Sequence, residues 1–228
     1  MRIGIIGSGR IGGNVGRLLA DAGHQVLFSF SRDPAKLQAL AAAAGVGTRA
    51  GSPAEAAGFG DVVLLSVPWD RIEDALRAAG SLAGRIVIDT TNQFGASGLV
   101  QLPGGLTAAE VNAARLPGAR LVKAFNTLTA GFQTQAAHRP PEQRVAMFLA
   151  GEDAQAKQVV AGLVADVGFE PVDLGGWAQV AIMEAPRRPG SVYGEEYRPD
   201  AARRIAAALR DDPQAAAELA DRLKVQGD

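Results

Sequence analysis

Short, continuous apolar runs recur along the chain and predict the strands of a buried parallel sheet. A strand that helices cover on both faces is typically an unbroken run of Val, Ile and Leu rather than an alternation of apolar and polar residues. Glycine, proline or polar residues follow each run, which is how strands in such sheets end. The predicted strands are residues 2–6, 24–30, 61–67, 85–91, 120–125, 144–151 and 169–175.

The segments between these runs carry helical patterns with recognisable starts. In residues 10–23, apolar side chains recur at helical spacing. Residues 33–45 and 52–58 open with Asp or Ser followed by Pro, the usual order of an N-cap and a first helical residue. Residues 127–143 show no clear pattern. Further helices are predicted over residues 70–80, 107–118 and 152–168.

This alternation predicts one doubly wound α/β domain of Rossmann type over residues 1–175, with a mostly parallel sheet and helices on both faces. Residues 176–228 are predicted as a short helical C-terminal appendage. It starts with an apolar helix, continues as a loop rich in Pro, Gly and charge at 186–200, and ends in two Ala-rich helices at 200–210 and 212–225. Their narrow apolar stripes indicate that these helices pack on another surface. That surface is either the domain of residues 1–175, where the segment would cover a cleft, or a second subunit.

Composition and charge narrow the class of protein. The 228 residues include 23 Lys and Arg against 24 Asp and Glu, so no excess positive charge favours nucleic acid or an anionic membrane as a partner. The chain has no Cys, which excludes disulfides and thiolate chemistry, and two His, too few to suggest a multi-His metal site. No apolar run is long enough for a membrane span or a signal peptide. We expect a soluble, cytoplasmic protein with a small-molecule partner.

The clearest motif is GSGRIG, which follows the first strand and opens the first helix. This spacing is typical of dinucleotide binding: the first Gly allows a tight turn, the second lets the backbone approach a pyrophosphate, and the third allows close helix–strand contact. The helix start adds free N–H groups and a positive dipole end. The alternative is a glycine-rich turn that has lost its ligand. The predicted cofactor-binding residues are Gly7, Ser8, Gly9, Arg10, Ile11 and Gly12.

Basic and hydroxyl side chains stand where an NAD enzyme usually carries an acidic residue. Such a residue accepts hydrogen bonds from the ribose 2′-OH of NAD and would repel a 2′-phosphate. Here Ser31 and Arg32 occupy the position, and Lys36 follows one helical turn later. Ser31 can donate to phosphate, Arg32 can bind it bidentately and Lys36 adds a point charge, whereas Asp33 is assigned to capping. These residues predict NADP(H); the alternative is that Arg32 and Lys36 form a solvated helix start.

Ligands of doubly wound sheets bind outside the carboxyl ends of the strands. Apolar residues at these ends are candidate walls for the cofactor, and neutral polar residues are candidate partners of a nicotinamide amide or a second substrate. Trp69 has core packing as its alternative, and Asp89 is predicted to cap the end of its strand. The candidates are Val67, Pro68, Trp69, Thr91, Asn92 and Asn126.

The catalytic residues are not evident, because the sequence contains no recognisable acid–base pair. Reducing a carbonyl group by hydride requires a proton donor, for which Lys123 and Asn126 are weak candidates. Passing a hydride between two cofactor rings requires mainly that the rings be oriented. The sequence favours the second kind of reaction. The alternative interpretation is that Lys123 is a surface lysine with no catalytic role.

Five segments resemble the NADPH-dependent coenzyme F420 reductases, also called F420:NADP oxidoreductases: RIGIIGSGRIG, GHQVLFSFSRDPAKL, DVVLLSVPWD, IVIDTTN and LVKAFNTL. The resemblance covers about residues 1–175. It implies hydride transfer between NADP(H) and a deazaflavin (coenzyme F420) or a flavin such as FMN or FAD, a 2′-phosphate site at Ser31, Arg32 and Lys36, and a homodimer. Two alternatives stay open: a small carbonyl or imine reductase with Lys123 as proton donor, and a non-catalytic NADP(H)-binding sensor module.

Overall fold

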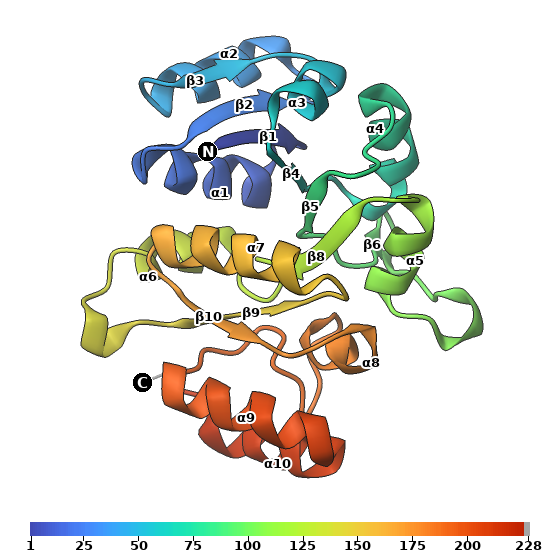
Figure 1. Ribbon diagram of the computed structural model, residues 1–228, viewed down its shortest axis with the longest axis vertical. Coiled ribbons are helices and arrows are strands. Elements are labelled where there is room, and N and C mark those ends of the chain that lie inside the picture. Colours follow the sequence, from blue (N-terminus) through green and yellow to red (C-terminus); the bar gives the residue numbers. More distant parts are fainter. Residues whose placement is uncertain (226–228) are drawn as a thin grey trace.

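Helices cover both faces of one eight-stranded sheet in the computed structural model (Figure 1). The structure describes residues 1–225. Strand order is β10-β9-β8-β5-β4-β1-β2-β3, and a two-stranded hairpin of β6 and β7 stands apart. The strands are β1 (Arg2–Ile6), β2 (Gln25–Ser29), β3 (Thr48–Ala50), β4 (Val62–Leu65), β5 (Ile86–Asp89), β6 (Phe94–Gly95), β7 (Gly98–Leu99), β8 (Arg120–Ala124), β9 (Ala146–Ala150) and β10 (Glu170–Asp173).

Six neighbouring strands of the sheet, in the order β8-β5-β4-β1-β2-β3, run parallel to one another. This arrangement confirms the predicted Rossmann fold. The chain starts at β1, continues outward through β2 and β3, and then returns to β4 on the other side of β1. This reversal leaves a crevice outside the carboxyl ends of β1 and β4, where ligands of such sheets bind. Both faces of these strands are covered, so every residue of β4 is buried.

The strand β9 runs antiparallel to β8, a detail that the sequence pattern did not predict. It pairs with β8 at Lys123–Ala150 and Ala124–Leu149, which are the last residues of both strands. β9 and its parallel partner β10 therefore extend past the carboxyl end of β8. The strands and the segment that follows them stand beside the same edge of the sheet as the crevice.

Several helices begin at side-chain caps, among them the predicted caps Asp33 and Ser52. Ser52 and Thr107 each form a capping box with the Glu three residues later, and Asp33 accepts hydrogen bonds from the N–H groups of Ala35 and Lys36. The helices are α1 (Arg10–Asp21), α2 (Pro34–Ala43), α3 (Pro53–Phe59), α4 (Ile72–Ala79), α5 (Ala108–Arg115), α6 (Ala130–Ala136), α7 (Ala154–Asp166), α8 (Trp177–Val180), α9 (Pro199–Asp211) and α10 (Pro213–Leu223). Short 3-10 turns lie at Trp69–Arg71, Pro103–Gly105, Pro141–Gln143 and Ala181–Met183.

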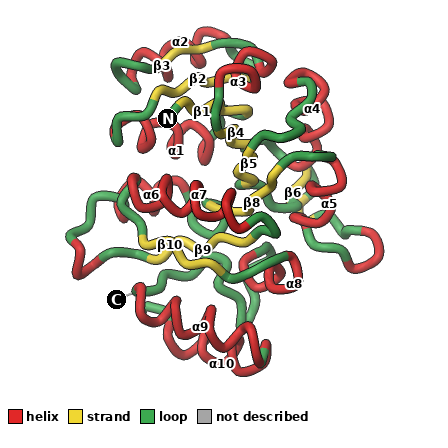
Figure 2. Tube along the Cα trace, in the orientation of Figure 1, coloured by secondary structure: helices red, strands yellow, loops and turns green. Residues whose placement is uncertain are grey.

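The core has a layer on each face of the sheet. Side chains of α1, α2, α6 and α7 share one apolar cluster with one face of the strands. Side chains of α3, α4 and α5 form a second cluster on the opposite face. In Figure 2, β1 and β2 lie between α1 and α3, and β9 and β10 lie between α7 and α9. The elements that the sequence pattern missed, β3, β6, β7 and α6, have at most seven residues, too few to show a clear periodicity.

The C-terminal segment packs on the β9–β10 end of the eight-stranded sheet. The predicted apolar helix is short: α8 ends at Val180 and passes into a 3-10 turn. Irregular chain follows, and α9 and α10 then pack against β9 and β10 in a third apolar cluster. Tyr197 is buried in this cluster, with its ring edge-on to Phe148 at 5.7 Å and its hydroxyl donating to the carbonyl of Ala220.

Candidate functional site

The glycine loop forms the first wall of the site. β1 ends at Ile6, Gly7 adopts φ +105°, and Gly9 is the N-cap of α1. A Cβ on Gly7 would clash with the carbonyl of Ser66, and one on Gly12 with the carbonyl of Gly7, so both positions exclude any side chain. A Cβ on Gly9 would meet nothing within 4 Å. The first and third glycines therefore serve packing, whereas the second faces open space beside the free N–H groups of the helix start.

A cavity of about 990 Å³ extends from this loop along the carboxyl ends of the strands. It joins residues from the ends of β1, β2 and β4, the 3-10 turn after β4 and the hairpin. Its size suits a ligand as large as a dinucleotide. The lining residues are Gly7, Ser8, Gly9, Phe30, Ser31, Arg32, Asp33, Lys36, Ser66, Val67, Pro68, Asp70, Arg71, Phe94, Gly95 and Ala96.

The structure brings the predicted phosphate-binding residues together in this cavity. Ser31, Arg32 and Lys36 all line it and are exposed to solvent. The hydroxyl of Ser31 donates to the backbone carbonyl of Asp33 at 3.1 Å, and Lys36 Nζ lies 4.0 Å from the Asp33 carboxylate. Phe30 adopts φ +56° and turns the chain at the end of β2 into this polar loop. The two cations thus have exposed heads that a phosphate can reach.

The three non-glycine residues of the loop, Ser8, Arg10 and Ile11, lie in three different environments. Ser8 lines the cavity, and its hydroxyl donates to the carbonyl of Ser29 at 2.9 Å, which joins the loop to the end of β2. Arg10 is exposed at the first position of α1. Ile11 is partly buried and packs against the core.

The residues after β4 divide between the cavity and the core. Val67 and Pro68 line the cavity. Trp69 instead is buried on the α3–α5 face of the sheet, with the guanidinium of Arg115 over its ring at 4.8 Å. The structure therefore gives Trp69 the packing role that the sequence left as the alternative.

The ends of β5 and β8 are joined by amide side chains. Asn92 donates from Nδ2 to the carbonyl of Asn126 at 3.0 Å, and Asn126 donates from Nδ2 to Asn92 Oδ1 at 3.2 Å and to the carbonyl of Met183 at 2.7 Å. Gln93 donates from Nε2 to the carbonyl of Ala185 at 2.9 Å. The C-terminal segment is thereby attached directly to the carboxyl edge of the sheet.

Two buried oxygens at this edge lack hydrogen bonds. Neither Asn126 Oδ1 nor Gln93 Oε1 has a partner among residues 1–225, although both atoms are removed from solvent. Buried acceptors are nearly always paired in folded proteins, because an unpaired one loses its hydrogen bonds to water. Both side chains direct their donors to the C-terminal segment, and their acceptors are buried without a partner.

Lys123 lies in a buried ionic network and not at the surface. Its Nζ donates to Asp89 Oδ2 at 3.0 Å and to the carbonyl of Thr91 at 2.7 Å, and lies 3.3 Å from Glu184 Oε1. An ammonium group has three N–H bonds, and three acceptors surround this one. The alternative of a surface lysine is therefore wrong. With its side chain fully buried, Lys123 has no open path to a substrate.

The two carboxylates of this network also fix the backbone. Glu184 accepts from the N–H groups of Ala108 and Ala109 at 2.7 and 2.8 Å, the start of α5. Asp89 accepts from the N–H of Thr91 at 2.8 Å, as predicted for a strand-end cap, and from Asn112 Nδ2 at 3.0 Å. The Thr91 hydroxyl accepts from the same Asn112 amide group, so Thr91 belongs to this network.

Sequence reasoning missed Glu184, Gln93 and Phe94. Glu184 could have been found, because it is one acidic residue inside the apolar stretch VAIMEAP. Gln93 and Phe94 carried no comparable signal, since they follow the strand-end motif in a loop whose course depends on tertiary contacts.

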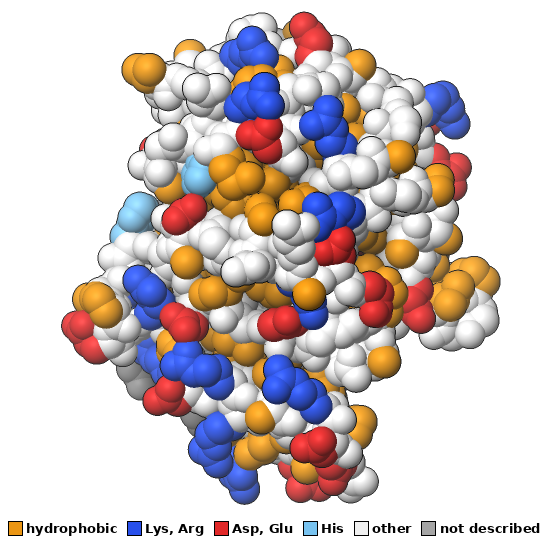
Figure 3. All heavy atoms as spheres, in the orientation of Figure 1, with side chains coloured by type: hydrophobic (Ala, Val, Ile, Leu, Met, Phe, Trp, Pro, Cys, Tyr) orange, Lys and Arg blue, Asp and Glu red, His pale blue; other side chains and the backbone are white. Residues whose placement is uncertain are grey.

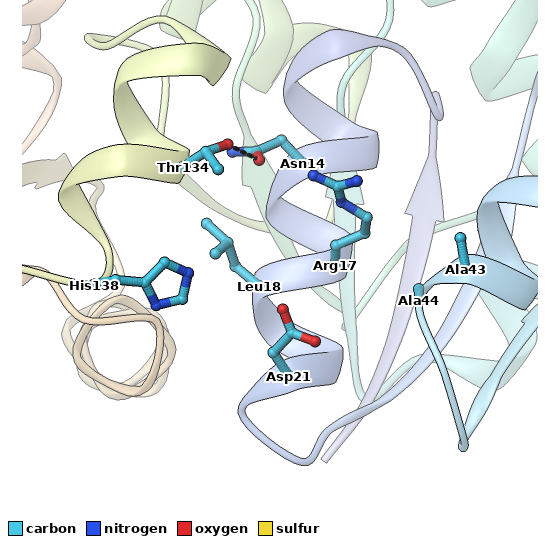
Figure 4. A pocket seen from close by; sticks show the side chains of 8 residues that line it. All are labelled: Asn14, Arg17, Leu18, Asp21, Ala43, Ala44, Thr134 and His138. Carbon is cyan, nitrogen blue, oxygen red and sulfur yellow. Dashed lines mark hydrogen bonds between the residues drawn. The ribbon is translucent and has the colours of Figure 1, made fainter.

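A smaller cavity of about 200 Å³ lies between α1, the end of α2 and the α6 region (Figure 4). Asn14, Arg17 and Asp21 of α1 line it, together with Thr134 of α6 and the exposed His138. The hydroxyl of Thr134 donates to Asn14 Oδ1 at 2.6 Å. None of the residues predicted to bind NADP(H) lines this cavity.

Residues 1–225 contain neither a metal site nor a membrane-spanning helix. No group of three or more His, Cys, Asp or Glu side chains is arranged to hold a metal ion. No helix in this range combines the length and the apolar character needed to cross a membrane.

Comparison with known proteins identifies relatives of most of the chain and a family model that matches its N-terminal part. Residues 2–93 match the sequence model of a family described as NADP oxidoreductase coenzyme F420-dependent. A hypothetical protein from Sinorhizobium meliloti shares 30% sequence identity, and its solved structure superposes with a TM-score of 0.76 over 86% of this chain and 94% of that one. A candidate F420-dependent NADP reductase from Arthrobacter sp. FB24 shares 27% identity, with a TM-score of 0.65 over 79% of this chain and 87% of the other.

A curated relative is longer than this chain. The metalloreductase STEAP3 of Rattus norvegicus is 28% identical over 184 residues, which cover 81% of this chain and 36% of the relative. The chain thus matches about a third of the length of that protein.

Proposed function

Because the chain belongs to the family of coenzyme F420-dependent NADP oxidoreductases, we propose that it transfers a hydride between NADP(H) and a deazaflavin or flavin acceptor. One observation carries the proposal: a single cavity has the glycine loop on one side and Ser31, Arg32 and Lys36 on another. A dinucleotide with a 2′-phosphate matches both, since its pyrophosphate suits the helix start and its 2′-phosphate the cations.

Several features fit bound NADP(H). The open space beside Gly9 admits a pyrophosphate that a side chain would obstruct. Asn126 Oδ1 and Gln93 Oε1 are unpaired acceptors near the ends of β5 and β8, but both atoms are removed from solvent and neither residue lines the cavity, so we do not assign them to the cofactor. Val67 and Pro68 would cover part of the cofactor between its two ends.

The bound cofactor would supply the hydride, and the protein would supply orientation. The Asn92–Asn126 pair and the Lys123 network hold the strand ends and residues 183–185 in one arrangement. Transfer between two rings depends chiefly on such orientation, so no side-chain proton donor is required at the centre. The saturated Nζ of Lys123 supports this reading over a carbonyl or imine reductase that uses Lys123 as its acid.

The test is a titration of the purified protein with NADPH and NADH, followed by addition of coenzyme F420, FMN or FAD. We expect tight NADPH binding, weaker NADH binding and rapid oxidation of NADPH by one of the acceptors. Tight NADPH binding without oxidation by any of them would reject hydride transfer to these acceptors and favour a non-catalytic sensor. Equal affinity for both nucleotides would reject the 2′-phosphate site. Assembly as a homodimer and a cytoplasmic location stay predictions.

A further inference from the structure

Phe94 presents an aromatic ring at the wall of the large cavity. Its residue surface is 44% exposed, and it lines the cavity together with Gly95 and Ala96. Met1, Val46, Leu99 and Leu106 are also exposed large apolar residues, but they are absent from the lining. An aromatic ring left in water at a binding cavity is a favourable surface for a ligand to cover.

The β6–β7 hairpin fixes the backbone that carries this ring. Phe94 N–H donates to the carbonyl of Asn92 at 2.7 Å, and Val100 N–H donates to that of Gln93 at 2.8 Å. Leu99 stands directly opposite Phe94 in the antiparallel pair, the position of closest cross-strand neighbours. The hairpin also packs against the Trp69–Arg71 turn, whose Asp70 and Arg71 line the cavity.

Phe94 and the phosphate-binding residues line the same cavity but follow different strands of the sheet. Phe94 follows β5, whereas Ser31 and Arg32 follow β2, and β4 and β1 lie between these two strands. Three strand spacings amount to about 14 Å. A dinucleotide anchored by its 2′-phosphate at β2 would thus reach toward β5 with its nicotinamide end. The second substrate has to meet the cofactor there.

We propose that Phe94 is a stacking platform for the flat ring of the second substrate, an oxidised deazaflavin or flavin. The inference rests on the proposed function and adds a residue that selects the acceptor. Planar rings stack on an aromatic face in an offset or edge arrangement, and a small aliphatic carbonyl compound gains little from such a face. Phe94 therefore favours tricyclic acceptors over simple ketones or imines.

The experiment measures binding separately from turnover. The protein is saturated with NADP⁺, which has no hydride to give, and titrated calorimetrically with oxidised FMN and with oxidised coenzyme F420. Three variants are compared with the wild type: Phe94→Ala, Phe94→Tyr and Leu106→Ala. Leu106 is the matched control, because it is 45% exposed and absent from the cavity lining.

Phe94→Ala is expected to weaken acceptor binding about 10-fold, the effect of losing one aromatic stacking partner. Phe94→Tyr and Leu106→Ala are expected to bind the acceptor as the wild type does, and NADP⁺ affinity is expected to stay the same in all three variants. Unchanged acceptor affinity in Phe94→Ala overturns the platform, as does failure of both acceptors to bind the wild type. A parallel loss of NADP⁺ affinity also overturns it, because the ring would then contact the cofactor.

The failure of this inference can be told from the failure of the proposed function. If the wild type binds FMN or F420 through Phe94 but never oxidises NADPH with them, the platform stands and the proposed reaction is rejected. If Phe94→Ala oxidises NADPH with the wild-type KM for the acceptor, the reaction stands and the platform is rejected.

Discussion

Glu184 and Lys123 form an ion pair inside the protein, with Oε1 and Nζ 3.3 Å apart and neither side chain more than 4% exposed. The pair joins the C-terminal segment to the end of β8, at the edge of the sheet where the cavity lies. Glu184 also holds the first two N–H groups of α5, and Lys123 also holds Asp89 at the end of β5. One lysine thus fixes three parts of the chain that are distant in sequence.

Lys123→Met is expected to destabilise the fold and not to remove a proton donor. Without the ammonium, Asp89 and Glu184 remain buried with no cation between them. Loss of one member of a buried ionic network typically costs about 3–5 kcal/mol. Urea denaturation of the apoprotein measures this cost.

The control for this change is Lys224→Met. Lys224 pairs with Asp221 and Glu195 at 3.4 and 3.6 Å with a third of its side chain exposed, so its loss should cost about 1 kcal/mol or less. If Lys123→Met keeps the wild-type stability but loses turnover by orders of magnitude, the structural role is wrong and Lys123 acts in catalysis.

The contrast between Lys123 and the glycine loop shows what the sequence could predict. The loop, the capping boxes at Ser52 and Thr107 and the cap at Asp33 depend on neighbours within a few residues, so their spacing predicts their geometry. Lys123 depends on Asp89 and on Glu184, which lie 34 and 61 positions away. No periodicity links such residues, and only the folded sheet brings them together.

The orientation of the Trp69 side chain also depends on residues distant in sequence. The sequence predicts the position of Trp69 after β4, at the carboxyl edge of the sheet. Its ring packs in the apolar cluster on the α3–α5 face, beneath the guanidinium of Arg115, which lies on a helix 46 positions later. A strand-end motif therefore predicts where a residue is, and tertiary packing decides whether it faces the ligand or the core.

Gly9→Ala and Gly12→Ala are expected to affect different properties: Gly12→Ala the stability of the fold, and Gly9→Ala the affinity for NADPH. A methyl group on Gly12 would clash with the backbone carbonyl of Gly7, so that variant should lose several kcal/mol of stability. A methyl group on Gly9 meets open space, so that variant should lose about 1 kcal/mol or less, from poorer N-capping. Its NADPH affinity should fall about 10-fold or more, because the methyl group would occupy the pyrophosphate position.

The measurement pairs thermal denaturation of the apoproteins with NADPH titration. Wild-type NADPH affinity in a stable Gly9→Ala variant would contradict the assignment of the loop. Equal stability of Gly12→Ala and wild type would contradict the packing role of the third glycine.

Arg32→Ala is expected to weaken NADPH binding and spare NADH. A hydrogen bond to a charged group contributes about 1.5–3 kcal/mol, or roughly 10- to 150-fold in the dissociation constant. Arg17→Ala is the matched control, because Arg17 is exposed and lines the smaller cavity instead. Fluorescence titration with both nucleotides measures the effect. An equal loss for NADPH and NADH would show that Arg32 does not contact the 2′-phosphate.

Asp153 is expected to make the stability of the protein depend on acid pH. It caps α7 by accepting from Ala156 N–H at 2.9 Å, and it accepts from Arg120 Nε and Nη2 of β8 at 2.6 and 2.9 Å. The hydrogen bonds from Arg120, followed by that from the backbone, hold the pKa of this carboxyl far below its ordinary value. The unfolded chain, with a carboxyl pKa of about 3.9, therefore binds the proton more readily than the folded one.

The sign of the effect follows from this order of pKa values. The stabilisation is fully present above the unfolded pKa of about 3.9 and is lost as pH falls toward the lower folded value. Asp153→Asn should consequently be less stable than the wild type at pH 7, and the difference should shrink below about pH 4 as the wild type loses its advantage. Urea denaturation at pH 7, 5, 4 and 3 measures it, with Asp200→Asn as control because Asp200 pairs with Arg203 at the surface. A difference that stays constant over this range would mean that the Asp153 carboxylate contributes through shape and not through its charge.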